Sequence, residues 1–261
     1  MSTSTLKVES GIQLLARLTK KPTIQNFYPP LFQSDPKPRE VIEITFSEDA
    51  PQCLLTDIIC TNLLPANFGG AEMGLLMFNC SGNFSYVSLM SRVRTKIMAN
   101  TTFTGDKIDD IIEGLFNNLF VVEIYDATQY YTTLYNLENV LTAHPNISMI
   151  IFDTITAFYW SEQGYKIQKM DTYLKRVLSK IQHVTREHNV IVLYTKPEYF
   201  NSHKDVSDNQ EPCCEFPCLE GVNYKIGVSY DKDNNYMAKI KSYNIQLEKG
   251  FCVTDDEIRW I

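Results

Sequence analysis

Short apolar runs alternate with amphipathic segments through the middle of this chain, and this alternation restricts the fold more than any other feature. Strands that alternate with helices form βαβ units and hence a parallel sheet. The runs Met149-Ile-Ile-Phe152 and Val190-Ile-Val-Leu193 are apolar at every position, which is typical of interior strands with helices on both faces. The pattern predicts an α/β fold with a mostly parallel twisted sheet and helices on both of its faces. The predicted strands are 41–46, 74–78, 119–125, 149–152 and 190–194, and the predicted helices are 51–64, 86–98, 128–143 and 165–188.

The longest predicted helix, 165–188, has one apolar face and one charged face. After Lys196 the sequence becomes a polar loop, 198–211, followed by short β segments around a turn at 231–235. We therefore expect a C-terminal antiparallel extension of the sheet. The apolar positions of the helix, which recur three and four residues apart, are Ile167, Met170, Leu174, Val177, Leu178, Ile181 and Val184.

Residues 1–40 differ from the core that we predict for 41–261, in which 41–197 form the βα units and 198–261 the loop and β extension. Ser10 is a candidate helix cap, and the apolar stripe behind it predicts one short helix. Five prolines then favour an extended strap over 19–40. The stripe consists of Ile12, Leu14, Leu15 and Leu18, and the prolines are Pro22, Pro29, Pro30, Pro36 and Pro38.

Composition excludes several classes of protein. The 261 residues are 44% hydrophobic, enough for a large core, and the net charge of −7 disfavours tight, autonomous binding of nucleic acid. No secretory signal or membrane span is visible, so we expect no membrane partner. The seven cysteines show no repeating spacing, which favours reduced thiols in the cytosol or nucleus.

In P-loop proteins the triphosphate lies between the first strand and the following helix, where backbone N–H groups and the positive helix end bind anions. A working loop needs glycines, a lysine for the β and γ phosphates and a Ser or Thr hydroxyl for magnesium. This chain has no glycine between Gly11 and Gly69 and no Gly-Lys-Ser/Thr motif. We therefore expect no nucleotide and no other cofactor. The residues at this junction are Ser47, Glu48, Asp49, Ala50, Pro51 and Gln52.

The charges at this junction also disfavour a bound nucleotide. Glu48 and Asp49 place carboxylates where an anion would sit. We expect them to interact with the positive N-terminal end of the following helix, with Pro51 in the first turn of that helix.

Two further strand ends bear on catalysis. The second strand is followed by amides, a thiol and a hydroxyl at 79–83, which supply no general base. Asp153 follows the strand at 149–152, a position that helps to hold magnesium in nucleotide enzymes. Its other interpretation is structural, with hydrogen bonds to Thr154, Thr156 or neighbouring N–H groups. We predict no catalytic residues and no enzyme activity.

Other candidate sites are weaker. Three cysteines and His203 lack the paired Cys-x-x-Cys spacing of zinc sites, so loop thiols are favoured over a metal. The segment 231–235 resembles a calcium loop but lacks its glycine and glutamate, so a hairpin turn is favoured. Aromatic residues at 158–160 fit either an interface anchor or core packing. The cysteines are Cys213, Cys214 and Cys218.

A set of basic residues follows the helix at 165–188 and fits either a DNA-phosphate contact or a solvated helix face. The net charge favours the solvated face. The set consists of Lys166, Lys169, Lys175, Arg176, Lys180 and Arg186.

Four motifs carry a resemblance to a known family: Glu9-Ser-Gly-Ile-Gln-Leu-Leu-Ala-Arg-Leu18, Thr133-Leu-Tyr-Asn-Leu-Glu138, His144-Pro145 and Phe152-Asp-Thr-Ile-Thr-Ala-Phe-Tyr-Trp160. Over residues 9–194 the chain resembles the paralogues of the eukaryotic RecA-like strand-exchange recombinases. The resemblance implies a RecA-like P-loop core and a nuclear protein that serves homologous-recombination repair of double-strand breaks. It also implies partners, namely other recombinase paralogues in a hetero-oligomeric complex, with DNA touched indirectly or weakly.

The chain departs from the family pattern at two places. A shortened segment, 47–52, replaces the Gly-rich Walker loop, and Pro197 replaces the polar residue that follows the fifth strand. The leading hypothesis is therefore a non-catalytic subunit of a repair complex, whose Pro-rich strap caps or bridges the assembly. Two alternatives stay open: a divergent ATP-binding, DNA-stimulated recombinase-like subunit, and an acidic interaction adaptor unrelated to repair.

Overall fold

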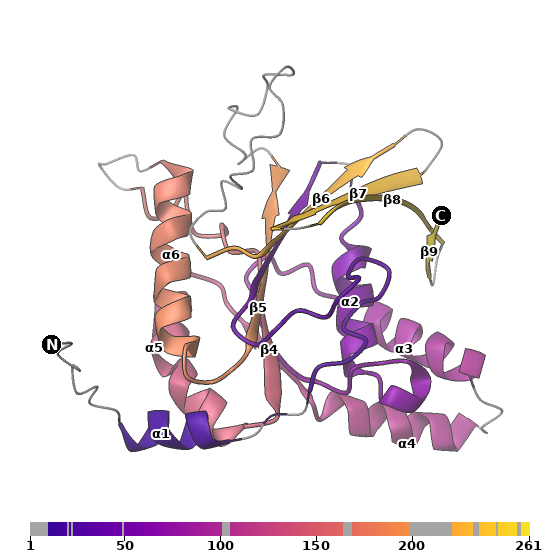
Figure 1. Cartoon of the computed structure of the whole chain (residues 1–261), viewed down its shortest axis with the longest axis horizontal. Coiled ribbons are helices and arrows are strands. Elements are labelled where there is room, and N and C mark those ends of the chain that lie inside the picture. The colour runs from indigo at the N-terminus through magenta and orange to yellow at the C-terminus, as the bar shows by residue number, and fades with distance from the viewer. Residues whose placement is uncertain are drawn as a thin grey trace, which may run out of the picture.

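The structure is a computed structural model that describes residues 10–19, 21, 23–48, 50–100, 105–163, 169–198, 221–231, 235–243, 245–254 and 257–261. Its centre is a nine-stranded sheet in the order β3-β2-β4-β5-β1-β6-β7-β8-β9 (Figure 1). The neighbours from β3 to β6 all pair in parallel. This order confirms the predicted parallel sheet. The parallel strands are β1 (Val41–Phe46), β2 (Gly74–Asn79), β3 (Leu119–Glu123), β4 (Ile147–Asp153), β5 (Ile191–Pro197) and β6 (Tyr224–Tyr230).

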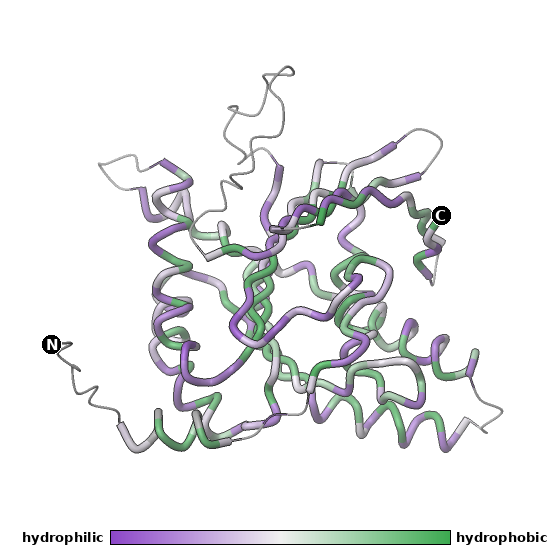
Figure 2. The backbone as a smooth tube through the Cα atoms, in the orientation of Figure 1, coloured by the Kyte–Doolittle hydropathy of each residue, from purple (hydrophilic) through white to green (hydrophobic). Residues whose placement is uncertain are grey.

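Helices cover both faces of the parallel strands other than β6, as predicted (Figure 1). Successive side chains of a strand point to opposite faces. Ile42 and Ile44 accordingly pack with one set of helices, while Val41 packs with the other. Figure 2 shows the resulting hydrophobic centre in green. The first face holds α2 (Cys53–Leu63), the short turn η1 (Ala66–Phe68), α3 (Tyr86–Asn100) and α4 (Gly105–Phe116), and the second holds α5 (Ala127–Ala143) and α6 (Met170–Thr185).

The C-terminal part is antiparallel, also as predicted. Strand β6 continues into β7 (Asn235–Ser242), β8 (Gln246–Val253) and β9 (Ile258–Trp260), each antiparallel to the strand before it. Alternate residues of β6, Tyr224, Ile226 and Val228, belong to the core on the α2 face. Their neighbours along the strand point the opposite way, where Figure 1 shows no labelled helix.

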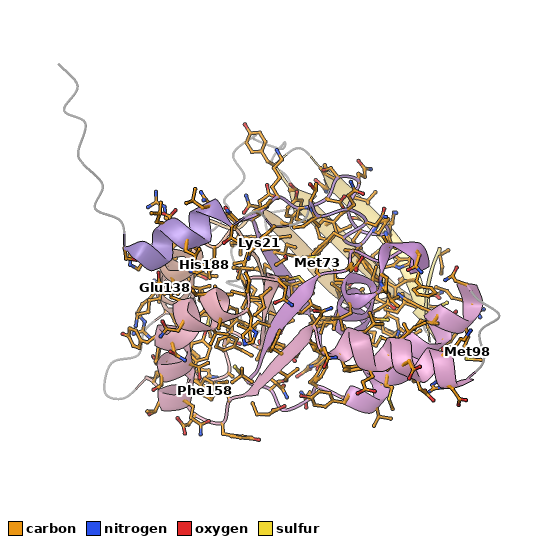
Figure 3. All side chains as sticks on the ribbon, turned by 90° about the horizontal axis from the view of Figure 1, so that it is seen from below. Lys21, Met73, Met98, Glu138, Phe158 and His188 are labelled. Atoms are coloured by element: carbon orange, nitrogen blue, oxygen red, sulfur yellow. The ribbon has the colours of Figure 1, made fainter. Side chains whose placement is uncertain are left out.

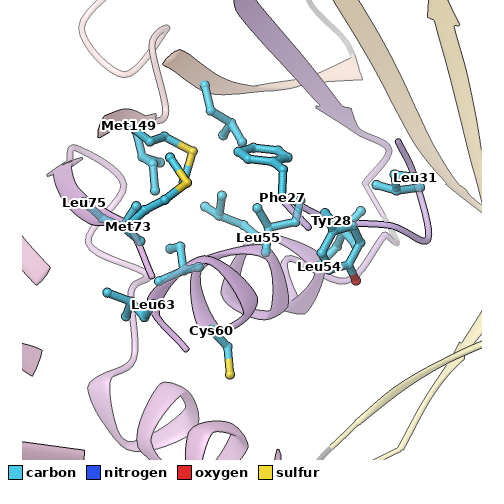
Figure 4. Packing of buried hydrophobic residues seen from close by; sticks show 14 of the residues in the cluster. Phe27, Tyr28, Leu31, Leu54, Leu55, Cys60, Leu63, Met73, Leu75 and Met149 are labelled. Atoms are coloured by element: carbon cyan, nitrogen blue, oxygen red, sulfur yellow. The ribbon is translucent and has the colours of Figure 1, made fainter. Parts of the chain in front are cut away.

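The N-terminal segment is tied to this core. Helix α1 (Gly11–Leu18) forms as expected, and the described residues between it and β1 contain no helix or strand. Phe27, Tyr28 and Leu31 of the strap are fully buried, and Figure 4 shows Tyr28 and Leu31 beside Leu54 of α2. Burying a side chain such as Phe27 or Leu31 stabilises the folded state by about 1.5–3 kcal/mol. The strap is therefore part of the hydrophobic core.

The apolar stripe of α1 does not face the core. Leu14, Leu15 and Leu18 are 42%, 56% and 63% exposed, whereas Ala16 is buried. Helical periodicity identified the helix, but it does not say which side a neighbour covers.

The chain turns inward again at Lys21, whose ammonium donates to the Ile147 carbonyl oxygen close to His188 and Glu138 (Figure 3). Within the described residues no helix is long and apolar enough to cross a bilayer.

Some element boundaries differ from the predictions. Helix α4 was missed, because its two glycines and three aspartates lower its helix propensity while packing of Ile108, Ile112 and Leu115 stabilises it. Helix α6 begins at Met170 rather than at 165. Residues 164–168, which include Ile167 and Lys166, lie outside the described residues.

Candidate functional site

The carboxyl ends of the parallel strands meet at one edge of the sheet, where α/β proteins bind ligands. Strands β1, β2, β4 and β5 all end there, in parallel register. The described residues that the sequence singled out, 47–48, 50–52, 79–83 and Asp153, therefore lie at this edge.

Two hydrogen bonds are present in the described part of the connection between β1 and α2. The Ser47 N–H donates to the Val228 carbonyl oxygen at 2.9 Å, and the Ala50 N–H donates back to the Ser47 oxygen at 3.0 Å. The Ser47 hydroxyl is buried and has no hydrogen-bond partner among the described residues. Glu48 is exposed, and Asp49 lies outside the described residues. The Ser47 and Ala50 N–H groups are therefore bonded within the protein, whereas a phosphate loop directs several N–H groups at the ligand.

Helix α2 starts later than predicted. Its first residue is Cys53, preceded by Gln52 as the N-cap, which makes no side-chain capping bond. The first turn contains no acidic residue. The expectation that Pro51 lies in the first turn is therefore wrong, because the helix begins only after Gln52, whose carbonyl accepts from the Leu55 N–H at 3.1 Å.

The lysine near the carboxyl end of β5 is already paired. Lys196 of β5 is 6% exposed, and its ammonium lies 3.1 Å from a carboxylate oxygen of Glu43 on β1. The Tyr194 hydroxyl donates to the other Glu43 oxygen. Separating a buried ion pair leaves an uncompensated buried charge, which costs about 3–5 kcal/mol. Lys196 is therefore a poor substitute for a phosphate-binding lysine.

A second buried ion pair fixes helix α2. Asp57 of α2 lies 3.0 Å from the Lys96 ammonium and 3.6 Å from the Arg92 guanidinium, both on α3. The Tyr28 hydroxyl of the strap donates to Asp57 at 2.6 Å. Burial, followed by the charge of Asp57, raises the pKa of Tyr28 well above its usual value. Both basic residues therefore pair with Asp57, although Nε and Nη1 of Arg92 have no hydrogen-bond partner among the described residues.

Asp153 is a buried acceptor between two strands. One of its carboxylate oxygens accepts from the Thr195 hydroxyl of β5 at 2.6 Å, and the other accepts from Ser81, after β2, at 2.9 Å. Its own carbonyl oxygen accepts the N–H groups of Cys80 and Ser81. The predicted partners were wrong, because Thr154 instead donates to the Thr195 carbonyl oxygen at 2.6 Å. Asp153 therefore joins β4 to both flanking strands.

The sequence did not indicate a carboxylate at the end of the second strand, but the fold supplies one. Asn79 and Glu123 are directly opposite in the pairing of β2 with β3, and the Asn79 amide donates to Glu123 at 2.7 Å. The Asn79 oxygen accepts from the Gly82 N–H at 3.1 Å. Burial, followed by the charges of Asp153 and Glu123, raises the pKa of Cys80 to about 12. Only the order of the strands reveals this pairing, since 44 positions separate the two residues.

Comparison with known proteins gives two informative matches. The chain is 20% identical to DNA repair protein XRCC2 of Mus musculus over 225 residues, which are 84% of this chain and 78% of that protein. It is 28% identical to the DNA repair and recombination protein RadB of Methanosphaera stadtmanae over 86 residues, 33% of this chain and 37% of that protein. The chain is a homologue of the RecA-like recombinase paralogues. No protein-family model matches it.

The homology and the observed sheet agree. A mostly parallel α/β sheet with C-terminal antiparallel strands is consistent with a RecA-like core. The similarity to two DNA repair proteins supports a recombinase-paralogue role in DNA repair.

The remaining candidates divide between core and surface. Phe158 and Tyr159 are buried, as core packing predicts, while Trp160 is 67% exposed. On α6, Arg176 pairs with Glu162 at 2.7 Å. Lys180 lies 4.5 Å from the centre of the Tyr131 ring. These contacts favour a structural role over a DNA contact for those two cations.

Several predicted sites lie partly or wholly outside the described residues. Asp231 donates its N–H to the Asn235 carbonyl oxygen at 2.8 Å, as a hairpin turn requires, although 232–234 are not described. In the described part of the chain no cluster of His, Cys, Asp and Glu side chains fits a metal ion. The zinc candidates His203, Cys213, Cys214 and Cys218 fall outside it.

Proposed function

We propose that this chain is a non-catalytic subunit of a nuclear complex that repairs DNA double-strand breaks by homologous recombination. In this proposal it acts by binding other recombinase paralogues. The observation that carries the proposal is the connection between β1 and α2, which has no glycine and no lysine and in which the Ser47 and Ala50 N–H groups are bonded within the protein. The similarity to XRCC2 and RadB supports the repair role.

The electrostatics of the same edge support a role without nucleotide. A triphosphate needs positive charge, since removing an anion from water without compensation is costly. Lys196 is held by Glu43, and Lys96 and Arg92 are held by Asp57. Releasing them for a phosphate would leave those carboxylates without their partners. We expect the protein to need no cofactor.

Affinity purification followed by mass spectrometry tests the proposal. A tagged full-length chain is expected to recover recombinase paralogues from nuclear extract, both with MgATP and after nucleotide has been removed by apyrase. The matched control is an Asp153→Asn chain, which is expected to recover the same proteins. Absence of every recombinase paralogue would defeat the repair role and favour an acidic adaptor. Recovery that depends on MgATP would contradict the non-catalytic role.

A second candidate is a divergent ATP-binding, DNA-stimulated subunit, which one observation favours. Asp153 keeps its place at the end of β4, the position from which magnesium is held in nucleotide enzymes. In that case the purified chain should bind ATP only with magnesium, and Asp153→Ala should abolish the binding. Isothermal titration with and without magnesium distinguishes the two candidates.

A further inference from the structure

The side of the C-terminal sheet that faces away from α2 carries exposed lysines. Along β7, Ala238 and Ile240 are buried, and the alternating Lys239 and Lys241 are exposed. Along β6, Lys225 is partly exposed and points to the same side as the β7 lysines, because it pairs directly with Lys241. We call Lys225, Lys239 and Lys241 the lysine face.

Strand register brings these charges together. Lys225 is directly opposite Lys241, and Lys239 is opposite Gly227. Like charges directly opposite one another destabilise a sheet. Lys239 and Lys241, two positions apart on one strand, are separated by about 6.8 Å. A Cβ atom added at Gly227 would meet no atom within 4 Å, so the face is open beside Lys239. The arrangement is unfavourable for the isolated protein and suits a ligand that carries repeated negative charge.

Carboxylates of the sheet compensate little of this charge. Glu43 lies beside Lys225 in the pairing of β1 with β6, but it is already bound to Lys196 and Tyr194. Glu248 lies 3.3 Å from Lys239, and both side chains are about half exposed (49% and 54%). Exposed pairs of this kind contribute about 0–1 kcal/mol and are easily exchanged. In the described part of the chain, no carboxylate forms an ion pair with Lys225 or Lys241.

We propose that the lysine face contacts the phosphate backbone of DNA held by the repair complex. This inference rests on the proposed function. Lysine is a point charge on a flexible stem, so it binds phosphate without reading bases. The contact is sequence-independent and weak, because the rest of the chain brings the net charge to −7. It positions the subunit on DNA that the complex as a whole binds.

Fluorescence anisotropy with labelled single-stranded and duplex DNA tests the proposal on the purified full-length chain. The test variant is Lys225→Gln/Lys241→Gln, which also removes the like-charge pair and should not lower Tm. The control is Lys37→Gln/Lys107→Gln, which changes the net charge equally at two exposed lysines outside the basic set of α6. The logarithm of the association constant for DNA falls linearly with the logarithm of the salt concentration. Losing two phosphate contacts should make this slope less steep by about 1.4–1.8. At about 0.1 M salt the test variant should bind about tenfold or more weakly than the wild type.

The outcomes are separable. The proposal holds if the test variant loses affinity and salt dependence while the control keeps both. It fails if the wild type does not bind DNA at about 50 mM salt, or if both double variants lose affinity equally. Should the double variant not fold, Lys239→Gln serves instead, with an expected slope change of about 0.7–0.9. Recovery of recombinase paralogues by the test variant shows that the proposed function stands whatever the DNA result.

Discussion

Replacing Asp153 by alanine separates its structural role from a magnesium-binding one. In the structure its carboxylate accepts two hydroxyl hydrogen bonds, from Thr195 at 2.6 Å and from Ser81 at 2.9 Å. A hydrogen bond to a charged group contributes about 1.5–3 kcal/mol, so Asp153→Ala should lower the free energy of unfolding by about 3–6 kcal/mol. At about 2–4 °C per kcal/mol for a chain of this size, Tm should fall by at least about 6 °C.

Asp153→Asn is the matched control for this experiment. The amide has nearly the shape of the carboxylate and keeps an acceptor for one hydroxyl, but it loses the charge. Since charged acceptors form hydrogen bonds about twice as strong as neutral ones, the control should lose about half as much stability. Both variants and the wild type are compared by thermal and urea denaturation.

The same denaturation measurements with MgATP test the alternative that the chain binds ATP through a magnesium ion held by Asp153. A ligand at 100 times its Kd stabilises the native state by about 2.7 kcal/mol, which corresponds to a rise in Tm of about 5–11 °C. We expect no rise for the wild type or for either variant. The reasoning is refuted if MgATP raises Tm of the wild type and not of Asp153→Ala, and if the variant is otherwise as stable as the wild type.

Three further predictions concern buried charges. Asp57→Ala leaves the buried Arg92 guanidinium without its carboxylate and should cost about 3–5 kcal/mol in urea denaturation, whereas a loss below about 1 kcal/mol would contradict the ion pair. Burial lowers the pKa of Lys21 from 10.5 to about 8. Between these values the unfolded chain binds more protons, so stability should rise with pH, and this rise should be absent from Lys21→Met when the two proteins are compared at about pH 7.5 and 9.5. Burial and then the Glu162 carboxylate raise the pKa of Tyr131 to about 12. Ultraviolet titration of Glu162→Gln should give a lower pKa that stays above about 10, because burial remains.

The parts of the fold that rest on periodicity could be predicted from the sequence. The strands at 149–152 and 190–194 were recognisable because all their residues are apolar, and both lie in the middle of the sheet. The lack of glycine and lysine between the first strand and the next helix was equally visible, because a phosphate loop requires both residue types. That no nucleotide binds there stays a prediction. Helix α4 was not recognisable, because its stability comes from packing against α3 rather than from its own propensity.

The pairings that define the site could not be predicted from spacing. Tyr194 and Glu43 are 151 positions apart, and Thr195 and Asp153 are 42 apart. Such pairs become neighbours only through the order β2-β4-β5-β1, which apolar periodicity does not specify. For Asp153, the sequence indicated a structural interpretation, but its partners depend on which strands lie on either side of β4.

The Asp57 cluster suggests how this fold stays ordered without a nucleotide. Helix α2 follows the turn where a triphosphate would bind, and a bound ligand would stabilise that turn and helix through its binding free energy. Here Asp57 joins α2 to Lys96 of α3 and to Tyr28 of the strap, and the Tyr28 ring lies edge-on 6.1 Å from Trp260 of β9. These contacts connect the N-terminal strap, the C-terminal strand and both helices at one buried carboxylate. Since they are covalently part of the chain, their stabilisation does not depend on ligand concentration, as the proposed non-catalytic subunit would require.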